Sequence, residues 1–117
     1  MARLSTHVLD MVRGGPAAGV RIELFRIDGA RRDLVCTAIT NSGGRTTEPL
    51  VEGDTLPAGV FELVFHAGDY FRGVGVALSS PPFLDEVAIR FGIDPAGGSY
   101  HVPLLLAPYG YSTYRGS

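Results

Sequence analysis

The chain has 117 residues and a formal net charge of −2, with 45% hydrophobic and 19% charged residues. This length and composition predict one globular domain, residues 1–117, and exclude a disordered tail. The acidic balance argues against a nucleic-acid partner, and no apolar run is long enough to span a membrane.

Turn-forming residues divide the sequence into short segments in which polar and apolar residues alternate. The expected strands, in chain order, cover residues 3–10, 20–28, 33–40, 60–66, 86–94, 99–107 and 109–115. A phase slip at Phe25 predicts a β-bulge or a strand buried on both faces. A short helix is expected around residues 68–75, with Tyr70, Phe71 and Val74 toward the core. Together these elements predict an all-β fold, an antiparallel β-sandwich.

Two of these strands have an unusual outward face. His101, Pro103 and Leu105 alternate with the core positions of residues 99–107, and His7 and Leu9 do the same in the first strand. An apolar outward face more often marks a subunit interface than bare surface. The two imidazoles converge only if the strands share one sheet or meet across an interface. Otherwise each histidine is an isolated surface residue. Proline, which has no N–H, suits a strand position without a partner on that side.

The remaining histidine, the single cysteine and the two chain ends have simpler interpretations. His66 is expected to be a surface or rim residue, and Cys36 a small buried thiol. A single cysteine excludes an intrachain disulfide, and the N-terminus lacks the apolar stretch of a signal peptide. A cytoplasmic setting is therefore expected. The tyrosine-rich C-terminus is either ordered against a partner group, with Ser117 held in place, or an edge strand that covers the sheet.

Three blocks of the sequence, one near each end and one in the middle, are informative together. They are Leu4-Ser5-Thr6-His7-Val8-Leu9-Asp10, Gly44-Arg45-Thr46, and the stretch from Tyr100 to the C-terminal Tyr114-Arg115-Gly116-Ser117. This set, which spans nearly the whole chain, resembles the transthyretin-like 5-hydroxyisourate hydrolase family. The resemblance implies a sandwich of two four-stranded sheets with one short helix. It also implies a homotetramer with active sites at the dimer–dimer interface, which would solve the difficulty of enclosing a pocket within one small subunit.

The same resemblance implies an activity and a site. The family opens the six-membered ring of 5-hydroxyisourate to give 2-oxo-4-hydroxy-4-carboxy-5-ureidoimidazoline. Carried onto this chain, the catalytic residues are His7, Arg45, His101 and Ser117, and the substrate contacts are His7, Arg45 and Tyr114. An imidazole accepts a proton near neutral pH, and a guanidinium holds an anionic ring. His7 is the expected principal base, alone or paired with His101, and the division of base and acid between them stays open.

No cofactor and no metal are expected, because neither histidine has a nearby carboxylate or cysteine in sequence and a fixed arginine repels a metal ion. Two other functions compete with the hydrolase. A transthyretin-like carrier would bind a small aromatic ligand in the same cleft, but an apolar channel has no need of two histidines and an arginine. An adhesion module would carry a secretion signal or disulfides.

Overall fold

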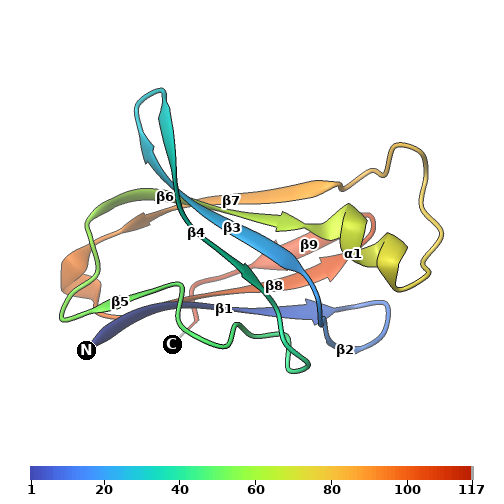
Figure 1. Cartoon of the computed structure of the whole chain (residues 1–117), viewed down its shortest axis with the longest axis horizontal. Helices are drawn as coiled ribbons and strands as arrows, with labels where there is room; N and C mark the ends of the chain where they lie inside the picture. The colour runs from blue at the N-terminus through green and yellow to red at the C-terminus, as the bar shows by residue number, and fades with distance from the viewer. Residues whose placement is uncertain (117) are drawn as a thin grey trace.

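The computed structural model describes residues 1–116, which form two packed β-sheets and one short α-helix (Figure 1). The strands are β1 (Ala2–Asp10), β2 (Gly15–Pro16), β3 (Arg21–Asp28), β4 (Arg31–Ile39), β5 (Val51–Gly53), β6 (Gly59–His66), β7 (Glu86–Ile93), β8 (Tyr100–Ala107) and β9 (Gly110–Thr113). The helix α1 spans Ala67–Gly73, and a 3-10 turn, η1, spans Pro95–Gly97. The predicted all-β sandwich is confirmed.

The first sheet places the two histidine-bearing strands side by side. Its order is β2-β1-β8-β9, and β5 also pairs with β1. β1 and β8 run parallel, and in their register Ser5 lies opposite His101 and His7 opposite Pro103. The resemblance implied four strands in this sheet. It has five, because the edge of β1 away from β8 is shared between the two short strands β2 and β5.

Pro103 determines where β9 ends. The ladder between β8 and β9 includes the pair Leu104–Thr113, and the next position would place Tyr114 opposite Pro103. Since proline has no N–H to donate, the regular ladder stops there, and the Pro103 carbonyl accepts a bond from the Thr113 hydroxyl at 2.7 Å. β9 is therefore shorter than the predicted range 109–115. The prediction that Pro103 lacks a ladder partner on one side is confirmed, and that side is the one toward β9.

The second sheet has the order β4-β3-β6-β7 and is antiparallel throughout. The register of β3 against β4 shifts between Leu24 and Phe25, which confirms the bulge predicted from the phase slip. This sheet carries none of the residues predicted to be catalytic. Its place in the fold is to cover the inner face of the first sheet (Figure 1).

Apolar side chains from both sheets meet in one core, as the alternation predicts. In β1 and β8 the inward positions are buried, whereas His7 and His101 on the opposite face are only half-buried. The largest fully buried side chains are Phe61, Phe65, Phe71, Leu4, Ile22, Leu24, Leu56, Leu63, Leu104, Leu106, Val8 and Val20. Burial of these groups drives the sheets together and fixes which face of the first sheet points outward.

The helix α1 closes one end of this core. Tyr70 and Phe71 are buried as predicted, and the Tyr70 hydroxyl donates a 2.6 Å bond to Asp10 at the end of β1. Burial and this neighbouring carboxylate raise the pKa of Tyr70 to about 12. The prediction for Val74 is wrong: the helix ends at Gly73, so Val74 is its C-cap and its side chain is exposed.

Candidate functional site

His7 lies on the outward face of β1, and one of its ring nitrogens is already engaged. Its Nε2 is 2.9 Å from the carbonyl oxygen of Gly43. A carbonyl oxygen only accepts, so the shared proton belongs to Nε2 of the neutral ring. The lone pair of Nδ1 is therefore left for chemistry, and the Gly43 bond fixes the tautomer of the ring.

His101 lies on the outward face of the neighbouring strand β8. Its Nδ1 is 2.8 Å from the hydroxyl oxygen of Ser5, the residue opposite it in β1. Burial lowers the pKa of His101, and the positive charge of Arg45 lowers it further, as would a proton on His7; a hydrogen bond with Ser5 has the opposite effect. The site thus favours a neutral imidazole at position 101.

Arg45 joins the two histidines from a loop beside β1. It forms an isolated antiparallel bridge with His7, and its charge acts on His101. Its side chain is exposed and makes no ion pair within residues 1–116, so the guanidinium is available to an anion. A cavity of about 280 Å³ lies beside it, lined by Arg3, Ser5, Thr6, Arg45, Thr46, Thr47, Glu48 and Pro49.

The loop that carries Arg45 is closed by Asn41 and Gly44. The Asn41 side-chain oxygen accepts bonds from the amides of Gly43 and Arg45, at 2.9 and 3.3 Å. Gly44 has φ of +74° and its carbonyl accepts the Val8 amide of β1 at 2.8 Å. A side chain at Gly44 would collide with the Val8 carbonyl. Gly44 thus lets the loop that carries Arg45 lie against β1.

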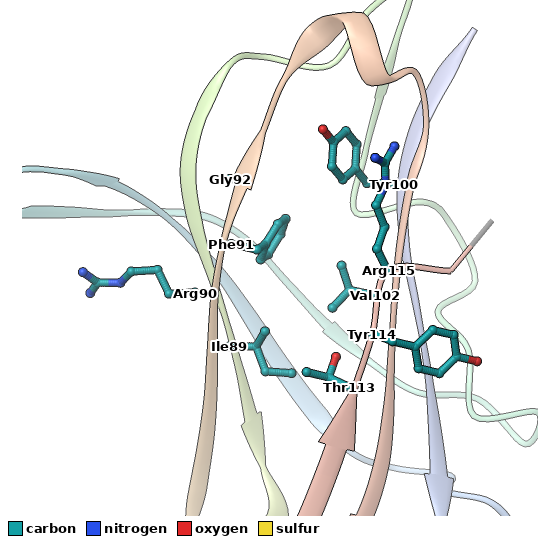
Figure 2. Close-up of a pocket in the computed structure, with 9 residues that line it drawn as sticks. All are labelled: Ile89, Arg90, Phe91, Gly92, Tyr100, Val102, Thr113, Tyr114 and Arg115. Atoms are coloured by element: carbon teal, nitrogen blue, oxygen red, sulfur yellow. The ribbon is translucent and has the colours of Figure 1, made fainter.

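Tyr114 and Ser117 were also predicted site residues. Tyr114 follows the end of β9 with its side chain 59% exposed, and its ring points away from Ile89 and Phe91 of the second sheet (Figure 2). No hydrogen bond among the described residues joins it to the histidines. Ser117 lies outside the described residues.

Sequence reasoning missed two residues that organise the site, Ser5 and Asn41. Ser5 shares the outward face of β1 with His7, but only the parallel pairing of β1 with β8 brings it to His101. Asn41 lies two residues before Gly43, a spacing at which an asparagine side chain commonly closes a turn.

His66 does not belong to this cluster. It lies at the end of β6 in the second sheet, where its Nε2 is 2.7 Å from the Glu23 carboxylate. Cys36 is half-buried, and burial raises the pKa of its thiol. Within residues 1–116, no three His, Cys, Asp or Glu side chains come together in a way that could hold a metal ion. None of the described helices has the length and apolar character needed to cross a membrane.

Comparison with known proteins gives a consistent result. The sequence model of the HIUase/Transthyretin family matches residues 4–116. A Rhizobium meliloti (strain 1021) protein named 5-hydroxyisourate hydrolase 2 is 59% identical over 115 residues, which cover 98% of this chain and 96% of the relative.

Three solved structures share the fold. An (S)-allantoin synthase has a TM-score of 0.92 and 42% identity; the match covers 99% of this chain but 44% of that one. The 5-hydroxyisourate hydrolase of Klebsiella pneumoniae has a TM-score of 0.81 and 36% identity, with both chains fully covered. A transthyretin from Sparus aurata has a TM-score of 0.86 and 27% identity, covering 99% of this chain and 97% of that one.

Proposed function

This chain belongs to the HIUase/Transthyretin family, and we propose that it hydrolyses 5-hydroxyisourate to 2-oxo-4-hydroxy-4-carboxy-5-ureidoimidazoline. The observation that carries the proposal is the meeting of His7, His101 and Arg45 on the outward face of one sheet. A carrier of apolar ligands would have no use for two imidazoles and an unpaired guanidinium at one place.

The proposed reaction begins with activation of water. His7 Nδ1, the ring nitrogen that the Gly43 bond leaves free, takes a proton as the water oxygen attacks the ring carbonyl carbon. The ring C–N bond then breaks, the new carboxylate forms, and the leaving nitrogen takes up a proton. A neutral His101, held by Ser5, is suited to exchange protons with the reacting groups through Nε2.

Arg45 has a different part, because it stays charged throughout. It binds the anionic substrate and stabilises the negative charge that develops on the carbonyl oxygen during attack. Tyr114 and Ser117 complete the proposed site by positioning the substrate or the water. No cofactor takes part in this scheme.

Turnover of freshly generated 5-hydroxyisourate, followed by ultraviolet absorbance, tests the proposal. We expect His7→Ala and His101→Ala each to lower kcat by about 10²–10⁴-fold, the usual contribution of a positioned acid or base. Arg45→Ala should raise KM and also lower kcat, because the guanidinium is proposed both to bind the anion and to stabilise the developing charge. His66→Gln is the matched control, since that histidine pairs with Glu23 on the other sheet. Near-wild-type rates in both catalytic histidine variants would defeat the proposed roles, and ligand binding without turnover would favour the carrier.

We further propose that the active protein is a homotetramer whose sites lie at the dimer–dimer interface. The support is the character of the outward face beside the histidines. Leu9 and Leu105 are only half-buried there, on the face of the first sheet that the second sheet does not cover. A second subunit would cover these apolar groups and enclose the cationic cluster.

A further inference from the structure

The C-terminal segment, residues 114–116, lies against the His101 ring. The Gly116 amide donates a 2.7 Å bond to the His101 carbonyl, and a Cβ placed on Gly116 would come within 2.7 Å of ring atom Cδ2. Only a residue without a side chain fits so close to the imidazole. The segment therefore covers part of the ring and contributes to the burial that keeps it neutral.

The backbone alone holds this segment weakly. Pro103 interrupts the ladder opposite Tyr114, and pairing resumes only as the isolated bridge between His101 and Gly116. Chain ends held by so few ladder bonds fray readily. A further anchor is needed if Gly116 is to stay on the ring.

Arg115 supplies that anchor from the opposite side of the segment. Its guanidinium lies 3.9 Å from the centre of the Tyr100 ring and donates to the carbonyl oxygens of Gly97 and Ser99, at 2.9 and 3.3 Å (Figure 2). Tyr100 is itself fixed: it is buried, and its hydroxyl accepts the Asp94 amide at 2.9 Å. The side chain of Arg115 thus ties the segment to the corner between β7 and β8.

This position also separates Arg115 from the reacting groups. It lines an apolar cavity of about 270 Å³ between the two sheets, together with Ile89 and Phe91. Figure 2 shows its guanidinium beside Tyr100, while the Tyr114 ring points to the other side of the segment. Arg115 therefore faces away from the outward surface that carries His7 and Arg45.

We propose that Arg115 is a positioning residue, which holds residues 114–116 against His101 without touching the substrate. The inference rests on the proposed hydrolase function for its effect on rate, but the anchoring itself is measurable without any substrate.

The test compares Arg115→Ala and Arg115→Lys with a matched control, Arg26→Ala. Arg26 also lies over an aromatic ring, that of Phe61 at 5.4 Å, and donates to the Ala58 carbonyl at 2.9 Å, but it belongs to the second sheet. Circular dichroism and the Tm of each variant establish that it folds. Arg115→Lys keeps the positive charge but cannot stack and bind both carbonyls as the planar guanidinium does.

Two readouts follow the segment directly. In Arg115→Ala the Gly116 amide should exchange with solvent about tenfold faster or more, because a ring contact and two charged hydrogen bonds are lost. NMR titration should show a higher His101 pKa, since the ring becomes more hydrated. Ser5, His7 and Arg45 still face the ring in every variant. Arg115→Lys should show smaller changes in the same direction. Because lysine keeps the positive charge, these changes reflect displacement of residues 114–116 and not the loss of a charge.

The catalytic readout should follow these changes. We expect kcat to fall by up to about 100-fold in Arg115→Ala, the size of effect that a small displacement of a catalytic group produces. Arg26→Ala should keep the wild-type rate, Gly116 exchange and His101 titration. Unchanged exchange and titration in both Arg115 variants would overturn the positioning role, whatever their activity. Absence of turnover in the wild-type protein would instead refute the proposed function, and the exchange data would still decide the role of Arg115.

Discussion

Arg45 has two effects at the site that follow from one charge. Its guanidinium makes no ion pair with any of residues 1–116, and its charge opposes protonation of the His101 ring. Before substrate arrives, the cation therefore keeps a neutral base beside itself. In the proposed mechanism, an anionic substrate would partly cancel that charge on binding, which would make it easier for the same imidazole to accept a proton.

The pH dependence of the site should reflect this coupling. Burial and the neighbouring cations hold the pKa of His101 below its usual value, so the ring stays neutral to lower pH than a free imidazole. Activity that needs neutral His101 should accordingly persist below the usual imidazole pKa and fall only as the pH drops through the lowered value. Arg45→Gln removes one of the opposing charges, so the His101 pKa should rise.

NMR titration of the imidazole in Arg45→Gln measures that shift without substrate. Arg31→Gln is the control, because Arg31 pairs with Asp33 at the exposed turn between β3 and β4. An unchanged or lower His101 pKa in Arg45→Gln would show that the guanidinium does not act on the ring. The Arg31 variant should titrate as the wild type does.

The loop of residues 41–45 decides whether Arg45 reaches β1 at all. Gly44 combines a positive φ of +74° with close contact to the Val8 carbonyl, whereas the adjacent Gly43 has room for a methyl group 3.4 Å from Asn41. Gly44→Ala should therefore destabilise the fold by about 1–3 kcal/mol from backbone strain alone, with the collision in addition. Gly43→Ala should cost much less.

Chemical denaturation measures the free energy of unfolding of these two variants. A loss at Gly44 alone would show that the positive φ and the close contact require glycine there, whereas equal losses would show that the loop tolerates no larger residue at either position. Folded Gly44→Ala protein should also lose catalytic rate, since displacement of the loop moves Arg45 away from His7. Equal stability of the two alanine variants would contradict the role given to Gly44.

The sequence predicted each strand better than the relation between strands. Alternation placed His7 and His101 on outward faces, because burial of every second apolar side chain depends on local order alone. The parallel pairing of β1 with β8, which brings Ser5 to His101, depends on residues 96 positions apart and left no local signal. Val74 was misplaced for a related reason: a helix of two turns gives too few positions to fix where it ends.

Motif resemblance, rather than periodicity, assigned a chemical role to Arg45 and the C-terminal tetrapeptide. It gave Tyr114 and Ser117 parts in the site but gave no separate part to Arg115 or Gly116. The structure separates its members by the side they face: Gly116 lies on the His101 ring, and Arg115 points to Tyr100. This difference depends on strand pairing, because the regular ladder between β8 and β9 ends next to Pro103 and residues 114–116 follow that end.

In the proposed tetramer, the outward face of the first sheet would serve both assembly and catalysis. It places half-buried Leu105 in the same strand as His101, two residues beyond Pro103. If a second subunit covers this face, a charge there must be buried without a partner or must prevent association. Leu105→Glu should therefore convert the proposed tetramer to smaller species and lower kcat/KM by at least about tenfold, although each subunit keeps its fold.

Light scattering after size-exclusion chromatography measures the assembly, and the absorbance assay on the same fractions measures turnover. Val74→Glu is the control, because Val74 is an apolar residue with 53% exposure at the end of α1. That variant should remain assembled and active. A Leu105→Glu protein that is monomeric and fully active would show that one subunit suffices, and the outward face would then need another explanation. Loss of both assembly and activity, with the circular dichroism spectrum retained, is the result expected if the site is completed between subunits.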